Sequence, residues 1–158
     1  PILQEAAARI RRFAGLKQSE RHDRPLIVIL TKCDVWSHLL ENPPGPDPYL
    51  PIRVGELAKS DQTSTMHALA MATVERTSSE ARALLLRTCP EIVTAAEGFS
   101  QDVTFIPVSA IGTKTQPAQS NGLPSIRPSD AAPTWATVPF LYGLAKGIPG
   151  LIPKMEKR

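Results

Sequence analysis

Two short polar segments, each placed directly after an apolar run, contain the residues whose types could bind a ligand. Thr31-Lys32-Cys33-Asp34 follows the apolar residues 26–30, and Ser109-Ala110 follows residues 103–108. An ionised carboxylate such as that of Asp34 accepts two adjacent hydrogen bonds at once. Both segments follow predicted strands, and ligands bind at the carboxyl ends of strands in open α/β sheets. The alternative is an ordinary turn in which Asp34 caps the helix that follows.

In this order and setting, the two segments resemble the guanine-specificity motifs of P-loop GTPases. These motifs are Asn/Thr-Lys-x-Asp after one strand and Ser-Ala after the next. The resemblance covers roughly residues 2–34 and 103–146 and implies the C-terminal half of a GTPase domain. It implies a partial P-loop NTPase fold of class α/β, with a few-stranded parallel sheet flanked by helices.

The resemblance assigns a role to each residue of the two motifs. Asp34 would accept the N1–H and the 2-amino group of guanine, a donor pair that adenine lacks. Lys32 would lay its aliphatic stem along the base and keep its ammonium in water. Thr31 would tie its loop to neighbouring backbone. The backbone N–H of Ala110 would donate to guanine O6, and Ser109 would shape that loop.

The groups that bind phosphates and Mg²⁺ in this family are not found in the sequence. No G-x-x-x-x-G-K-[ST] motif occurs, and Gly112-Thr113-Lys114-Thr115 has the wrong spacing for one. The resemblance therefore implies that GTP or GDP, and Mg²⁺ with it, would be bound together with a half that precedes Pro1. This chain by itself is expected to hydrolyse no GTP and to bind it weakly or undetectably.

Periodicity predicts the elements that position the two motifs. Continuous apolar runs predict strands at 26–30 and 103–108, and Pro107 places the second strand at a sheet edge. Apolar stripes predict helices at 2–17, 64–88 and 137–146, with a short helix at 52–60 and a further turn at 92–96. Proline-rich residues 42–51 and polar residues 112–134 predict loops. We expect one domain over 1–147, with a helical insertion at 52–96 and a tail at 148–158.

The sequence predicts only two strands, and two parallel strands make a poor independent domain. The strand at 26–30 has the composition of a strand buried on both faces. With only one other predicted strand as a partner, its outer edge would stay unpaired. The sequence therefore predicts that this sheet is part of a larger one.

Composition bounds the remaining function classes. The chain has 158 residues, a net charge of +3 and two cysteines without metal-ligand spacing, so we expect free thiols in a reducing cytoplasm and no metal site on Cys or His side chains. No apolar run has the length of a membrane span, and the N-terminus is not a basic-then-apolar leader. Basic clusters without interleaved aromatic residues favour no nucleic acid.

A second function class remains open beside guanine-base recognition. The predicted insertion and the proline-rich loops would also suit a scaffold that keeps a GTPase-like fold, hydrolyses nothing and docks a protein partner. An insertion without function, or an unrelated α/β domain, would leave the same pattern.

Overall fold

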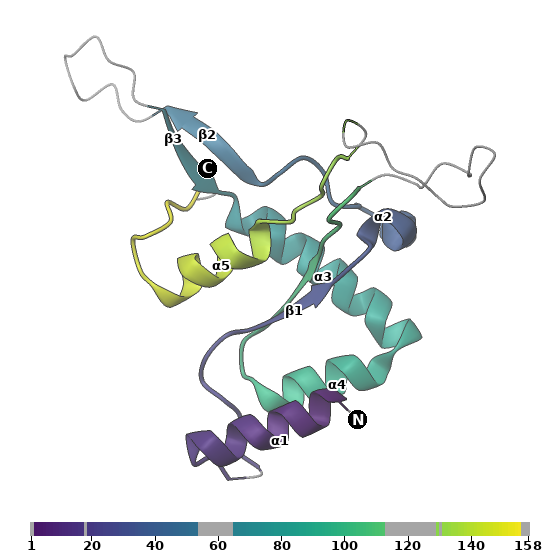
Figure 1. The fold of residues 1–158 in the computed structure, drawn as a ribbon, viewed down its shortest axis with the longest axis vertical. Coiled ribbons are helices and arrows are strands. Elements are labelled where there is room, and N and C mark those ends of the chain that lie inside the picture. Colours follow the sequence, from purple (N-terminus) through teal and green to yellow (C-terminus); the bar gives the residue numbers. More distant parts are fainter. Residues whose placement is uncertain (1, 18, 54–64, 113–128, 130, 156–158) are drawn as a thin grey trace.

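The computed structural model describes residues 2–17, 19–53, 65–112, 129 and 131–155. Its centre is a parallel pair of strands, β1 (Leu26–Leu30) and β4 (Val103–Pro107), in which Val28 lies opposite Phe105. The two predicted strands are therefore confirmed. The fold is mixed α/β, with a small parallel sheet flanked by helices (Figure 1).

Helices cover both faces of the strand pair. On one face, α5 (Val138–Gly147) contributes Val138, Tyr142 and Ala145 to a core that also holds Ile106 and is joined by Ile27. On the other face, α3 (Met71–Thr88) and α4 (Pro90–Phe99) pack around Phe105. Side chains of a strand alternate between faces, so its uniformly apolar sequence supplies both cores.

The two outer edges of the strand pair differ. On β4, the N–H of Phe105 donates to Ser78 Oγ of α3 over 2.8 Å, and Pro107 has no N–H to satisfy. On β1, Leu26 N–H and Leu30 C=O bond toward β4 and its continuation, so the groups of Ile27 and Ile29 point the other way. Within the described residues no strand pairs with that second edge of β1.

An antiparallel hairpin replaces parts of the predicted helical segment and the last three residues, 49–51, of the predicted loop at 42–51. Strands β2 (Tyr49–Arg53) and β3 (Thr65–Leu69) pair with Tyr49 opposite Leu69. The helix predicted at 64–88 is wrong at its start: α3 begins only at Met71, because Leu69 is buried and bonds through its N–H to Pro153 C=O over 2.8 Å. The helix predicted at 52–60 is wrong for residues 52–53, and its remainder lies outside the described residues.

Helix α4 is longer than the single predicted turn. It begins at Pro90, which starts the helix instead of only ending the one before it, because the first helical position needs no N–H donor. A bidentate pair between Arg82 of α3 and Glu97 of α4 joins these two helices and lowers the pKa of the Glu97 carboxyl.

The first helix, α1 (Ile2–Ala14), ends three residues before its predicted end. The face that it turns toward the rest of the chain also differs from the prediction. Among residues 4–14, whose burial the structure describes, Ala7 alone is buried; Arg11 Nη2 donates to Gly98 C=O over 2.6 Å, and α1 packs on α4. Ile10 and Phe13 of its apolar stripe are 46% and 90% exposed. Most of the stripe that periodicity places in a core therefore faces outward.

Candidate functional site

The two sequence motifs meet at the carboxyl ends of β1 and β4. Val108 N–H donates to Leu30 C=O over 2.9 Å, and Cys33 N–H donates back to Val108 C=O over 3.0 Å. This exchange continues the parallel ladder past both strands. It sets the loop after β1 beside the loop after β4 (Figure 1), as the predicted pair of parallel strands requires.

A side-chain hydrogen bond joins the motifs directly: Ser109 Oγ donates to Asp34 Oδ1. The same Ser109 hydroxyl accepts the N–H of Gly112 over 2.9 Å, which folds the second loop back on itself. Ser109 is 3% exposed, whereas Asp34 is half-buried. A carboxylate has about four lone-pair sites, so Asp34 keeps acceptor capacity for two further donors.

This contact decides against the helix-cap interpretation of Asp34. Asp34 lies inside the short helix α2 (Cys33–Trp36), whose N-cap is Lys32 and has no side-chain cap. The Asp34 carboxylate is bonded instead to a residue 75 positions away in the chain. Its orientation is therefore set by the neighbouring strand end.

The second motif has one backbone N–H for which the described residues provide no acceptor. Ser109 exchanges two backbone hydrogen bonds of 2.9 Å with Thr134, which fixes the loop. The next residue, Ala110, is exposed, and its N–H donates to no acceptor within the part of the chain that the structure describes. An amide held between fixed neighbours is suited to donate to a ligand carbonyl.

The first motif contains a left-handed residue. Lys32 has φ 56° and ψ 39°, and its side chain is exposed. Thr31 is also exposed, and its hydroxyl has no hydrogen bond among the described residues. Its carbonyl accepts Trp36 Nε1–H over 2.9 Å. The predicted tie of Thr31 to neighbouring backbone is therefore not seen among the described residues, and the hydrogen bond at Thr31 is instead one that its own carbonyl accepts from a tryptophan.

Cys33 lies between the exposed Lys32 and the half-buried Asp34 and is itself 1% exposed. Burial, together with the neighbouring charge of Asp34, raises the pKa of its thiol, so the neutral form is favoured. A buried thiol of raised pKa packs as a small apolar side chain rather than reacting. Both Cys33 and Cys89 are free.

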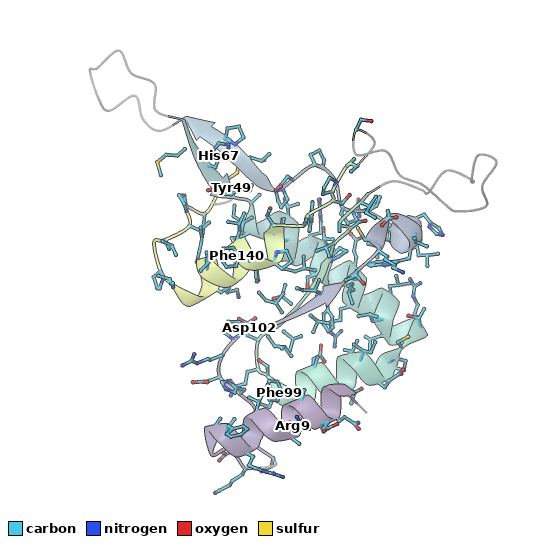
Figure 2. All side chains as sticks on the ribbon, viewed as in Figure 1. Arg9, Tyr49, His67, Phe99, Asp102 and Phe140 are labelled. Carbon is cyan, nitrogen blue, oxygen red and sulfur yellow. The ribbon has the colours of Figure 1, made fainter. Side chains whose placement is uncertain are left out.

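Two apolar hollows flank the open edge of β1, and Ile29, itself 51% exposed, lines both. The hollow of about 520 Å³ lies beside α5; Figure 2 marks Phe140, which is 70% exposed. Its lining residues are Ile27, Ile29, Val108, Ala110, Ala136, Pro139 and Phe140. The second, of about 400 Å³, lies beside α3 and reaches Thr31 and Trp36. Asp34 lines neither hollow.

The opposite end of the strand pair has a different polar contact. Asp102, labelled at that end in Figure 2, pairs with Lys146 of α5 over 3.0 Å. Although burial alone would lower the pKa of Lys146, the hydrogen bond to Asp102 raises it overall. This ion pair ties α5 to the start of β4, far along the strands from Asp34.

Sequence reasoning did not find two residues that shape the site. Trp36 lies two positions after the motif and holds it by its indole N–H. Gly112 has φ 68°, and a Cβ there would lie 1.6 Å from Ala132 O. The glycine after Ser-Ala was a usable signal, because glycine is the residue that adopts positive φ without cost.

Among the described residues, no three His, Cys, Asp or Glu side chains come together as metal ligands. No helix in the described ranges is long and apolar enough to cross a membrane. Comparison with protein-family models gives no match, and neither curated proteins nor solved structures give one.

Proposed function

We propose that this chain is the guanine-recognising part of a GTP-binding protein. The observation that carries the proposal is the pairing of the two motifs at adjacent strand ends, where Ser109 orients the Asp34 carboxylate. Asp34 accepts the N1–H and 2-amino group of guanine, and the free N–H of Ala110 donates to O6. Lys32, exposed beside Asp34, supplies its aliphatic stem to the face of the base.

The open edge of β1 supports the proposal that phosphates are bound by another part of the protein. The backbone groups of Ile27 and Ile29 point toward that edge, while α3 covers the edge of β4. A wholly apolar strand is typical of a sheet interior, where strands pair with it on both sides. The unpaired edge of β1 therefore suits pairing with a further strand. In the proposal, the phosphate-binding half adds the next strand here, and the two hollows beside Ile29 receive its side chains.

Direct binding to this chain tests the base site. Because the proposal places base contacts but no phosphate contacts in this chain, guanosine and GTP are expected to bind equally and weakly, with dissociation constants in the millimolar range, about −4 kcal/mol. Amide signals of Asp34 and Ala110 shift in nuclear magnetic resonance titrations with guanosine and not with adenosine. If adenosine produces the same shifts, the base assignment is refuted. If GTP binds micromolar while guanosine does not, phosphate contacts exist in this chain.

A substitution at the carboxylate tests its role. Asp34→Asn replaces one acceptor oxygen by a donor, so the preference moves from guanosine to xanthosine, which has a carbonyl in place of the amino group. Asp23→Asn is the matched control, because Asp23 is exposed at the other end of β1. In the full-length protein the same exchange moves the preference from GTP to XTP. An unchanged preference removes Asp34 from the site.

A further inference from the structure

The loop that holds Lys32 and Asp34 has an unfavourable backbone that something must maintain. Lys32 occupies the left-handed region, with φ 56° and ψ 39°, where a side chain with Cβ is disfavoured. Such a conformation persists only where the surroundings determine it strongly. The hydrogen bonds on either side of Lys32 therefore decide whether the loop keeps its shape.

These hydrogen bonds bracket Lys32. On its C-terminal side, Cys33 N–H donates to Val108 C=O over 3.0 Å, which anchors the loop to the end of β4. On its N-terminal side, the carbonyl of Thr31 accepts Trp36 Nε1–H over 2.9 Å. The first anchor is a backbone contact that any sequence could make, whereas the second depends on one side chain.

The Trp36 ring faces a hollow that a distant element also lines. The half-buried ring lines the 400 Å³ hollow together with Leu39, Leu84 and Leu85. Leu84 and Leu85 belong to α3, which packs on β4. Helix α3 thus lines the hollow that the ring faces, and the ring donates to the Thr31 carbonyl.

We propose that Trp36 is a positioning residue of the guanine site: its indole N–H fixes the Thr31 carbonyl, keeps Lys32 left-handed and thereby places the Lys32 stem and the Asp34 carboxylate on the same base. The choice of guanine as the ligand rests on the proposed function. The geometric part of the inference, that the Trp36 indole N–H keeps Lys32 left-handed, does not. A ligand that contacts Lys32 and Asp34 then depends on a side chain that it never touches.

The geometric part is tested without ligand. In the isotope-labelled chain, the Trp36 indole N–H exchanges slowly with solvent. The three-bond coupling between the amide and α protons of Lys32, taken together with the strong intraresidue Overhauser effect between them that a positive φ produces, reports the left-handed conformation. Trp36→Phe keeps a ring in the hollow, removes the donor and changes that coupling. Trp135→Phe is the matched control, because the Trp135 indole donates to Gly45 and Pro46 carbonyls instead; it leaves the Lys32 signal unchanged.

The functional part uses guanosine as the probe. Trp36→Phe weakens guanosine binding about 3- to 10-fold, the factor expected for one lost hydrogen bond. A changed Lys32 coupling with no guanosine binding even to the unmodified chain supports the clamp and refutes the base site. An unchanged Lys32 coupling in Trp36→Phe overturns the clamp, whatever guanosine does.

A second route keeps the test decisive if Trp36→Phe does not fold. Leu84→Ala removes part of a half-buried side chain that lines the same hollow as the Trp36 ring. It changes the Lys32 coupling in the same direction as Trp36→Phe does. Indole exchange in the unmodified chain needs no variant at all. If the Trp36 indole N–H exchanges as fast as a free indole, its hydrogen bond does not hold the loop, and the inference fails.

Discussion

Removing the hydroxyl of Ser109 tests the contact on which the candidate site depends. Ser109→Ala deletes two hydrogen bonds, one donated to the Asp34 carboxylate and one accepted from Gly112 N–H. A hydrogen bond to a charged group contributes about 1.5–3 kcal/mol and an ordinary one about 0.5–1.5 kcal/mol. Asp34 and Gly112 are both half-buried, so water replaces part of what is lost. We therefore expect a loss near the lower end of the sum, about 2 kcal/mol.

The assay is equilibrium unfolding in urea together with thermal unfolding. For a chain of this size, a loss of about 2 kcal/mol lowers Tm by about 4–8 °C. Ser79→Ala is the matched control, because it removes the same atom from an exposed position of α3, where Ser79 Oγ donates only to the Glu75 carbonyl. Its effect stays within about 0.5 kcal/mol.

A double-mutant cycle separates the contact from other effects of the serine. If Ser109 acts through the carboxylate, Ser109→Ala and Asp34→Ala are less than additive, with a coupling of about 1 kcal/mol or more. Additive effects, or a Ser109→Ala variant as stable as Ser79→Ala, would show that the two strand ends are not joined by this bond. The proposed orientation of Asp34 would then be refuted.

Three further predictions concern Gly112 and the two cysteines. In urea unfolding, Gly112→Ala is destabilised by about 2–4 kcal/mol, because its Cβ would overlap Ala132 O at a position of positive φ. Gly147→Ala is the control and is not destabilised in this way, because a Cβ there meets open space. Equal stability of the two variants would disprove this loop geometry. Iodoacetamide modifies Cys89 in the folded chain before the buried Cys33, as peptide mapping reports. Because burial raises the Cys33 pKa in the folded state, its ionisation favours unfolding, and stability falls as pH rises above about 8.5, the unfolded value. Cys33→Ala removes this part of the pH dependence, and an unchanged alkaline slope would contradict it.

Local pattern predicted the strand pair well. Residues 26–30 and 103–107 are short, apolar and rich in branched side chains, and such runs form strands wherever both faces can be buried. Pro107 indicated an outer edge, and β4 does turn that edge toward α3 rather than toward β1. The parallel direction of the two strands was enough to predict that Asp34 and Ser109 come together.

Pattern failed where partners far along the chain decide the structure. Residues 65–69 have helical spacing with the helix that follows, yet they pair with residues 49–53 and with the segment near Pro153, which no local window includes. Periodicity predicts a core face for the apolar stripe of α1, but Ile10 and Phe13 of that stripe are exposed and α1 packs on α4.

By itself, the sequence determined which residue types stand at the ends of two apolar strands, because strand propensity and alternating burial are local properties. Only the tertiary structure decided how those residues are held. The Asp34 carboxylate is oriented by a hydroxyl from the end of the neighbouring strand. The left-handed Lys32 follows a carbonyl that accepts a hydrogen bond from a tryptophan, and this tryptophan lines a hollow together with α3. Hydrogen bonds of this kind depend on distances across the fold, and sequence spacing does not contain them.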